Sequence, residues 1–408
     1  MQSSTESKKE EFKTSFFVHE EAGKVYEECW DYKGEVPLWA VYNYRKGGKP
    51  FVETGSPIPV AGEERVYAPL TGDEVREKLV VLPSGVEEYG SEEKLVEEIR
   101  THIHRWLDIP GDFEELCSYY ILLTWFHDPL FTIPYLRVLG DTGTGKSRFL
   151  DVVGRLCYKP MKISGAVTPS PIYRLLKKWK GTLIIDEADF RKSDESHEIV
   201  KILNCGFERG TPVIRSDKDN PNNIETFYVF GPKVIATRRT YADKALEARC
   251  MTETMQETSR TDIPVTLDQT FFKEQERLRN KLLCYRLKLV GDWLRSLEKG
   301  ENGTNGTNVT FDLSGIEPRL KQLASSFFLA FSNNKRILTR FGKWLRKYQY
   351  EIISERSNTY EGEIVNYIYE WAKSKNVPFV PFVPRVWGVS SVNGTDTYCD
   401  MIYKYKNN

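Results

Sequence analysis

A glycine-rich segment at residues 140–147 constrains the fold of this chain more than any other feature. It reads Gly-Asp-Thr-Gly-Thr-Gly-Lys-Ser, between an apolar run at residues 135–139 and a helix-like run at residues 147–156. In such a strand–loop–helix, glycines let main-chain N–H groups close around phosphates where a Cβ would obstruct them. The N-terminus of the helix also favours an anion. The segment therefore predicts a phosphate-binding loop in an α/β fold.

The side chains of this loop predict how a nucleotide is held. Lys146 would meet the β- and γ-phosphates, and the Ser147 hydroxyl would hold Mg²⁺. ATP and Mg²⁺ are the expected cofactors. The residues expected to bind the nucleotide are Gly140, Asp141, Thr142, Gly143, Thr144, Gly145, Lys146, Ser147 and Arg148.

A second motif, at residues 181–187, supplies the acids that hydrolysis needs. Residues 182–185 form a short apolar strand that would deliver Asp186 and Glu187 to its carboxyl end. Successive residues of a strand point to opposite sides, so one carboxylate can serve a metal and the other a water molecule. We assign Asp186 to Mg²⁺, together with Ser147, and Glu187 to the attacking water. The second acid favours an ATPase over a GTPase or a small-molecule kinase.

Length and cysteine content limit the class of protein. The 408 residues exceed one typical core, so two or three domains are expected. The longest apolar stretch, residues 119–126, is too short to span a bilayer, and residues 1–11 show no secretory signal. The seven cysteines form no Cys-x-x-Cys pair. An odd number without such pairs favours reduced thiols in the cytoplasm.

Charge is unevenly distributed along the chain, although it sums to zero. Residues 1–130 carry 14 Lys and Arg against 26 Asp and Glu, whereas residues 131–408 carry 44 against 32. The phosphate loop lies in the basic part. A basic ATPase suggests an anionic partner, with nucleic acid the leading candidate.

Composition and periodicity divide the chain into regions of different character. Within the core, strands at residues 135–139, 161–164, 183–185 and 233–236 alternate with helices at 146–156, 171–179 and 195–205. This alternation predicts a parallel sheet with helices on both faces. The expected regions are a disordered tail (1–14), a β-rich domain (15–85), a helical connector (90–130), the ATPase core (131–256), a helical lid (257–300), a flexible loop (301–311) and a C-terminal helical module with a winged helix as one interpretation (312–408).

Beyond the two motifs, the chain resembles the AAA+ ATPases. Lys233–Thr237 is an apolar strand ending in a small polar residue, as in the sensor-1 strand of that family. Residues 245–250 are similar to the arginine-finger segment of clamp loaders and minichromosome maintenance helicases, although Ala248 stands where the family has Ser. The resemblance implies that Thr237 positions the water. It also implies that Arg249 reaches the ATP of a neighbouring subunit in a homo-oligomeric ring, expected to be a hexamer.

Other arginines compete for these roles. Arg238 and Arg239 directly follow the sensor strand and are alternative fingers. In the lid helix, either Arg277 or Arg279 could be a second sensor that touches the phosphates, and Arg279 is preferred.

Two β-rich runs, at residues 211–215 and 225–230, flank an Asp/Asn/Pro-rich tip and predict a hairpin before the sensor strand. The hairpin resembles an insertion that minichromosome maintenance and superfamily 3 helicases place in the central pore to grip DNA. This resemblance implies phosphate contacts from Arg209, Arg215 and Lys218, although two aspartates in the tip dilute its charge. An ordinary βα connection is the alternative.

A second basic element lies further along the chain. Its cations recur at helical spacing with aromatic residues between them. A solvated basic face and a nucleic-acid-binding face are equally compatible with this pattern. The cations are Lys335, Arg336, Arg340, Lys343, Arg346 and Lys347.

We therefore expect an α/β AAA+ ATPase that forms a ring and translocates on or unwinds DNA, for a plasmid, a virus or an integrated element. One alternative is an ATP-switched factor that remodels or assembles proteins, with the N-terminal β-rich domain binding the partner. A defence or signalling ATPase would share the same core.

Overall fold

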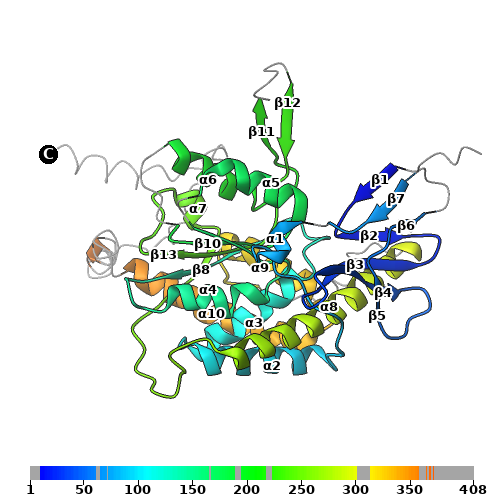
Figure 1. Ribbon diagram of the computed structural model, residues 1–408. Helices are drawn as coiled ribbons and strands as arrows, with labels where there is room; N and C mark the ends of the chain where they lie inside the picture. Colours follow the sequence, from blue (N-terminus) through cyan, green and yellow to red (C-terminus); the bar gives the residue numbers. More distant parts are fainter. Residues whose placement is uncertain are drawn as a thin grey trace, which may run out of the picture. The chain divides into compact units, whose positions relative to one another are not determined.

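The computed structural model describes residues 10–60, 65–70, 72–164, 167–188, 194–216, 223–300 and 313–357, with residues 364, 367, 368 and 371 (Figure 1). The chain divides into two compact units, residues 1–349 and 350–408. The expected boundaries near residues 256, 300 and 312 therefore do not separate compact units. The expected 301–311 loop and nearly all of the possible winged helix lie outside the described residues.

Five parallel strands form the central sheet of the first unit, in the order β14-β8-β13-β10-β9. Most residues of these strands are apolar and buried, as expected where helices cover both faces of a sheet. This sheet confirms the α/β class. The sequence did not predict β14, because its residues alternate with threonine and glutamate and lack an apolar run. The strands are β8 (Tyr135–Leu139), β9 (Met161–Ser164), β10 (Leu183–Asp186), β13 (Lys233–Thr237) and β14 (Cys250–Thr254).

Helices lie on both sides of this sheet (Figure 1). The helix that follows the phosphate loop packs against β8, β10 and β13. The helices connecting the strands are α4 (Lys146–Val152), which continues into a 3-10 turn at Gly154–Leu156, α5 (Pro169–Trp179), α6 (Asp194–Cys205) and α7 (Lys244–Glu247).

Two smaller sheets precede the core. One is antiparallel, with β2 (Phe16–His19), β3 (Lys24–Asp31), β4 (Val36–Asn43) and β5 (Phe51–Thr54) in sequence order; the other has the order β1 (Glu10–Lys13), β7 (Arg65–Ala68), β6 (Ile58–Pro59). Strand β1 corrects the expectation that residues 1–14 are disordered. Its side chains are exposed and only Phe12 is apolar, so its parallel pairing with β7, and the edge-on contact of Phe12 with Tyr67 of β7 at 5.6 Å between ring centroids, define it.

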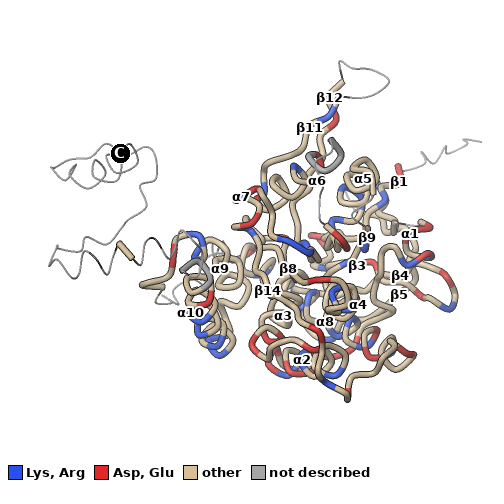
Figure 2. Tube along the Cα trace, turned by 90° about the vertical axis from the view of Figure 1, so that its left-hand side faces the viewer, with Lys and Arg blue, Asp and Glu red and all other residues tan. Residues whose placement is uncertain are grey.

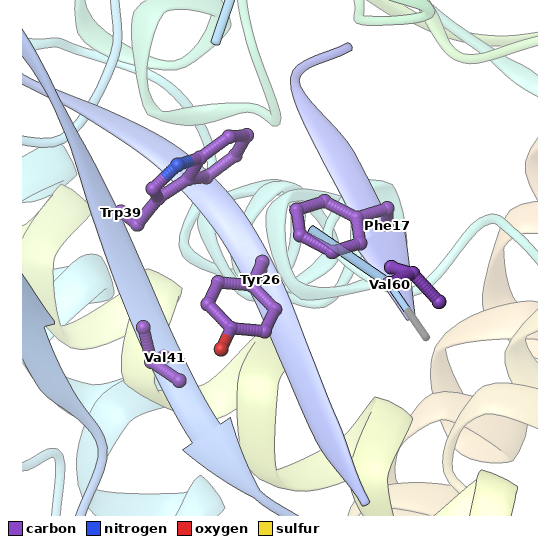
Figure 3. Packing of buried hydrophobic residues seen from close by; sticks show 5 residues of the cluster. All are labelled: Phe17, Tyr26, Trp39, Val41 and Val60. Atoms are coloured by element: carbon purple, nitrogen blue, oxygen red, sulfur yellow. The ribbon is translucent and has the colours of Figure 1, made fainter. Parts of the chain in front are cut away.

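An aromatic cluster holds the two small sheets together (Figure 3). The ring of Phe17 stacks on Tyr26, with centroids 4.6 Å apart, and on Tyr67, with centroids 4.7 Å apart. Trp39 meets Phe17 edge-on at 5.4 Å. These ring pairs give the β-rich region a core of its own.

The remaining helices surround the sheet and cover its edge. They are α1 (Asp73–Arg76), α2 (Glu92–Trp106), α3 (Gly111–Thr124), α8 (Gln269–Glu298), α9 (Pro318–Ala330) and α10 (Lys335–Ser357). Because β14 is an edge strand, its outward N–H groups need partners. The Tyr348 hydroxyl, on α10, accepts a hydrogen bond from Thr252 N at 2.9 Å. No helix among the described residues is long and apolar enough to cross a membrane.

Buried ion pairs join the N-terminal sheets to the core and to the lid helix. Glu27 on β3 lies 2.6 Å from Lys159 and 2.7 Å from Arg286 of α8. Arg286 also pairs with Asp128 at 2.5 Å. Removing one partner of such a buried pair costs about 3–5 kcal/mol, because the other charge stays buried. This network explains why the β-rich region and the ATPase core form one compact unit.

Candidate active site

The conformation of the phosphate loop depends on its glycines. Gly143 and Gly145 have φ angles of +91° and +87°, a region that favours glycine. A Cβ on Gly140 would lie 2.7 Å from Thr144 Oγ1 and 2.8 Å from the carbonyl oxygen of Met255. The sequence did not indicate Met255, because it follows the unpredicted strand β14.

The Lys146 ammonium lies against the loop itself. It donates hydrogen bonds to the carbonyl oxygens of Gly140, at 2.6 Å, and Asp141, at 2.5 Å. A phosphate offers charged acceptors, which bind an ammonium more strongly than neutral carbonyls do. Ser147 and Thr142 are exposed on the same loop. The loop can therefore receive an anion without refolding.

The order of the strands brings the predicted catalytic residues to one edge of the sheet. Strand β13 lies between β8 and β10, and its last residue, Thr237, is the Cα partner of Leu139. The Thr237 carbonyl oxygen accepts a hydrogen bond from Gly140 N at 3.2 Å. Asp186 ends the neighbouring strand β10. Thr237 thus lies between the phosphate loop and the acidic pair.

Two features of this edge fit a Mg²⁺–nucleotide. The Thr237 hydroxyl is buried, and Oγ1 has no hydrogen-bond partner among the described residues. Leaving a buried hydroxyl unpaired costs about 1–3 kcal/mol, so a ligand at this edge would relieve that cost. The described residues contain no group of three or more His, Cys, Asp or Glu that could hold a metal. One carboxylate and one hydroxyl, completed by phosphate oxygens and water, are instead typical of Mg²⁺.

Glu187 is held by an arginine of its own subunit. Its φ angle is +55°, which is unusual for a residue with a side chain. Its Oε1 accepts a hydrogen bond from Arg238 Nη2 at 3.2 Å, and both side chains are exposed. Arg238, an alternative finger in the sequence, therefore contacts the acid beside its own phosphate loop.

Arg249 lies at the opposite end of the sheet from the phosphate loop. It directly precedes β14, whose five residues at about 3.3 Å each separate it by about 16 Å from the loop edge. Its Nη1 donates a hydrogen bond to the Asn204 side-chain oxygen, and Asn204 Nδ2 donates one to Asp243 at 2.8 Å. Arg249 therefore lies far from the phosphate loop of its own chain. The sequence did not reveal Asn204, which α6 contributes.

The structure does not bring Arg148 to the nucleotide as predicted. Its guanidinium donates hydrogen bonds to the carbonyl oxygens of Pro264, at 2.7 Å, and Val265. These carbonyls belong to the segment between β14 and α8. Arg148 therefore anchors this segment beside α4.

The predicted second sensors also lie away from the phosphate loop. Arg277 pairs with Glu87 at 2.8 Å. Arg279 is buried and donates to Gln275 Oε1, while Gln275 itself bonds to carbonyl oxygens at the far end of α4. Burial lowers the pKa of Arg279 to about 10. Helix α8 runs past the C-terminal end of α4, and this placement excludes either arginine from the phosphates in this conformation.

The predicted hairpin is present. Strands β11 (Val213–Ser216) and β12 (Ile224–Phe227) pair antiparallel and extend away from α5 and α6 (Figure 1). The tip, with Lys218, lies outside the described residues. Ile214 and Ile224 share one face of this hairpin by register, and 62% and 70% of their surfaces are exposed. Tyr228, directly after β12, is also exposed.

Two of the three cations predicted to meet DNA phosphates, Arg209 and Arg215, contact other groups of the protein. Arg215 occupies the opposite face of the hairpin, 3.1 Å from Glu198 and over the ring of Tyr173. Arg209 precedes the hairpin and donates to the carbonyl oxygens of Leu130, at 3.0 Å, and Asp128, at 2.7 Å. Neither guanidinium is presented outward from the hairpin.

Helix α10 combines an apolar buried side with a basic exposed side. Phe341 stacks on Phe327 of α9, with centroids 4.5 Å apart. Arg340 and Lys347 pair with Glu115 and Asp112 of α3. Lys and Arg residues line the helix in Figure 2. The cations exposed without being paired to α3 include Lys335, Arg336 and Lys343.

Comparison with known proteins finds resemblance only among solved structures. No family model matches the chain, and no curated protein matches it. A structure of the SCCmec type IV Cch active helicase is 9% identical, with a TM-score of 0.38 over 91% of this chain and 85% of that chain.

Two further solved structures are similar. The JCV helicase is 12% identical, with a TM-score of 0.28 over 62% of this chain and 60% of that chain. A full-length MCM homolog from Methanopyrus kandleri is 11% identical, with a TM-score of 0.34 over 74% of this chain and 69% of that chain. At such identities and TM-scores the likeness assigns no activity, which depends on the site itself.

Proposed function

We propose that this protein is an ATP-hydrolysing ring motor that binds DNA and translocates on it or unwinds it. One observation supports the proposed hydrolysis of ATP. The phosphate loop, the Asp186–Glu187 pair and the unpartnered hydroxyl of Thr237 converge at one edge of a parallel sheet. These groups supply phosphate binding, a metal ligand and a position for water.

Each side chain has a separate task in hydrolysis. Lys146 exchanges its carbonyl partners for the β- and γ-phosphates, and Ser147 and Asp186 would hold Mg²⁺, which neutralises charge on the phosphates when bound. Glu187 leaves Arg238 and orients the attacking water. Thr237 donates a hydrogen bond from its hydroxyl to an oxygen at the reacting centre. Charge-stabilising contacts of this kind account for much of the rate of phosphoryl transfer.

A buried lysine ties the hairpin to the strand that ends in Thr237. Lys233 begins β13, and its ammonium donates to the carbonyl oxygens of Val229, at 3.0 Å, and Gly231, at 2.8 Å. A third bond reaches Gly206 at 3.3 Å. Because both carbonyls at the root of the hairpin are fixed to β13, a shift of this strand on hydrolysis would move the hairpin. This supports a mechanical role for the hairpin.

Two exposed surfaces favour contact with DNA. The hairpin suits contact with bases, and helix α10 suits contact with phosphates. Ile214, Ile224 and Tyr228 offer apolar and aromatic surface, and an aromatic ring can stack on a base whatever its sequence. The cations on α10 offer contacts to phosphate. The same apolar hairpin face would also fit an unfolded protein segment. For this reason an ATP-switched protein-remodelling factor is the second candidate.

The test compares the ATPase rate without nucleic acid, with single-stranded DNA and with duplex DNA, on protein whose assembly state has been measured. The hairpin variant Ile214→Ser/Ile224→Ser/Tyr228→Ser should reduce DNA affinity by about tenfold or more, since stacking contributes about 1–3 kcal/mol per base. The ratio of stimulated to basal ATPase rate should fall with it.

A matched control replaces exposed apolar residues on another strand. Phe51→Ser/Val52→Ser changes two exposed residues of β5 and should keep DNA affinity and stimulation. Unchanged DNA binding and unwinding in the hairpin variant would reject the proposed contact between the hairpin and DNA. Stimulation by protein, without strand separation, would favour the second candidate.

A further inference from the structure

Two arginine side chains share one aromatic ring at the end of the sheet opposite the phosphate loop. The guanidinium carbons of Arg249 and Arg319 lie 5.4 Å and 5.0 Å from the centroid of Phe207. Arg319 stands in the first turn of α9, and its Nε donates to the carbonyl oxygen of Ala248 at 2.9 Å. A residue of the C-terminal helices is thus bound directly beside Arg249.

Neither guanidinium is paired with a carboxylate among the described residues. Arg249 donates to the amide oxygen of Asn204, and Arg319 donates to Ala248 O and to Gln322. All these acceptors are neutral. The carboxylate in this cluster, Asp243, accepts hydrogen bonds from Asn204 and from main-chain N–H groups of α7 instead. By contrast, Arg137 and Arg286, on β8 and α8, are each paired with carboxylates.

The two positive charges therefore oppose each other. Burial lowers the pKa of Arg319, and the charge of Arg249 lowers this pKa further. Like charges at short range destabilise each other, and an anion placed between them would remove that cost. Phosphate suits such a pair, because its oxygens can accept from two guanidinium forks at once.

We propose that Arg319 acts with Arg249 on the terminal phosphate of a nucleotide bound by a neighbouring copy of this chain. The proposal rests on the proposed function, in which Arg249 acts in trans. The subunit's own phosphate loop lies about 16 Å away along the strand, so the phosphate must come from another subunit. A head-to-tail interface, with the arginine pair of one copy at the phosphate loop of the next, can repeat around a closed ring.

The first measurement is steady-state ATP hydrolysis by Arg319→Ala and Arg319→Lys, with ATP affinity measured separately. Arg319→Ala should lower kcat by at least about tenfold, the scale for losing a charge-stabilising donor, with little change in ATP affinity. Arg319→Lys keeps the charge but lacks the planar fork, so its kcat should lie between those of Ala and wild type. The control is Arg295→Ala, which removes a partly exposed arginine of α8 paired with Asp292.

Subunit mixing separates action in trans from a packing role. Lys146→Ala subunits have an inactive phosphate loop but both arginines. Arg319→Ala subunits have an intact phosphate loop but lack one arginine of the pair. In an equal mixture, about a quarter of the head-to-tail interfaces pair an intact loop with an intact arginine pair. The mixture should therefore hydrolyse ATP faster than either variant alone. A packing defect within the Arg319→Ala subunit would not be rescued by its neighbour.

The outcomes distinguish this inference from the proposed function. If Arg249→Ala is inactive and rescued by mixing while Arg319→Ala keeps wild-type kcat, only the role of Arg319 is rejected. If Arg249→Ala also keeps wild-type kcat and the protein is monomeric with ATP, the trans arrangement itself fails. If Arg319→Ala loses DNA affinity but mixing restores no hydrolysis, the pair binds nucleic acid and the proposal is overturned.

Discussion

Replacing Thr237 with valine should make the protein more stable and less active at the same time. Valine has the shape of threonine and suits a buried strand, but it lacks the hydroxyl. In the nucleotide-free protein this hydroxyl has no hydrogen-bond partner among the described residues and is wholly buried. Its removal costs no contact of the resting protein, whereas hydrolysis loses a group at the reacting centre.

The two effects have different sizes. An unsatisfied buried polar group costs about 1–3 kcal/mol, so the free energy of unfolding should rise by about 1 kcal/mol or more in Thr237→Val. For a protein of this size, an increase of 1 kcal/mol corresponds to a rise in Tm of about 1–1.5 °C. Removal of one donor to developing charge should reduce kcat by about 100-fold. Thermal unfolding without nucleotide and steady-state ATP hydrolysis measure these effects.

The neighbouring strand provides a matched control. Thr182, immediately before β10, is equally buried, and its hydroxyl also lacks a partner among the described residues. It lies at the opposite end of the sheet from the phosphate loop, since strand β10 ends at Asp186. Thr182→Val should therefore raise Tm by a similar amount and leave kcat unchanged.

Two results would refute this reasoning. If Thr237→Val hydrolyses ATP at the wild-type rate, the hydroxyl has no part in the reaction. If both valine variants are destabilised, the buried hydroxyls are satisfied in the folded protein and their lack of partners is no sign of a binding site.

The further predictions concern charged residues of the site and a buried carboxyl group. Lys146→Ala should abolish nucleotide binding, whereas Glu187→Gln should still bind ATP but hydrolyse it about 100-fold more slowly; a normal rate in the Gln variant would disprove the assignment to water. Burial raises the pKa of Glu28 from 4.5 to about 8, so native Glu28 keeps a proton that the unfolded chain loses. Its contribution to stability is present below pH 4.5 and is lost as pH rises to about 8. Glu28→Gln, which keeps an acceptor for Leu70 N, should be more stable than wild type at pH 8 and equal to it near pH 4.5 in denaturant titrations; a constant difference across this range would refute the assignment.

The sequence by itself determined the local parts of the site. The phosphate loop requires glycines at positive φ, and the motif at residues 140–147 therefore fixes its own conformation. The short apolar runs before the loop and before Asp186 identified buried strands, because parallel strands covered on both faces need continuous apolar residues. These features depend on neighbours in the chain.

The direction in which a strand residue faces depended on register. Arg215 was predicted to meet DNA, but pairing of β11 with β12 places it toward α5 and α6. Side chains alternate between the faces of a strand, so a shift of one residue would have turned it outward. Nothing in the local composition sets that register. The same applies to β1, whose exposed residues form a strand because β7 lies beside them.

The tertiary structure alone decides which hydrogen-bonding partners far apart in sequence come together. Arg249 and Asn204 are 45 residues apart, and Arg286 and Glu27 are 259 apart. An arginine in a basic helix and a buried arginine look alike in sequence, because the difference is the desolvation that packing imposes and the acceptor that packing supplies. The sequence could therefore predict the nucleotide chemistry. Only the fold could decide which arginines are free to take part in it.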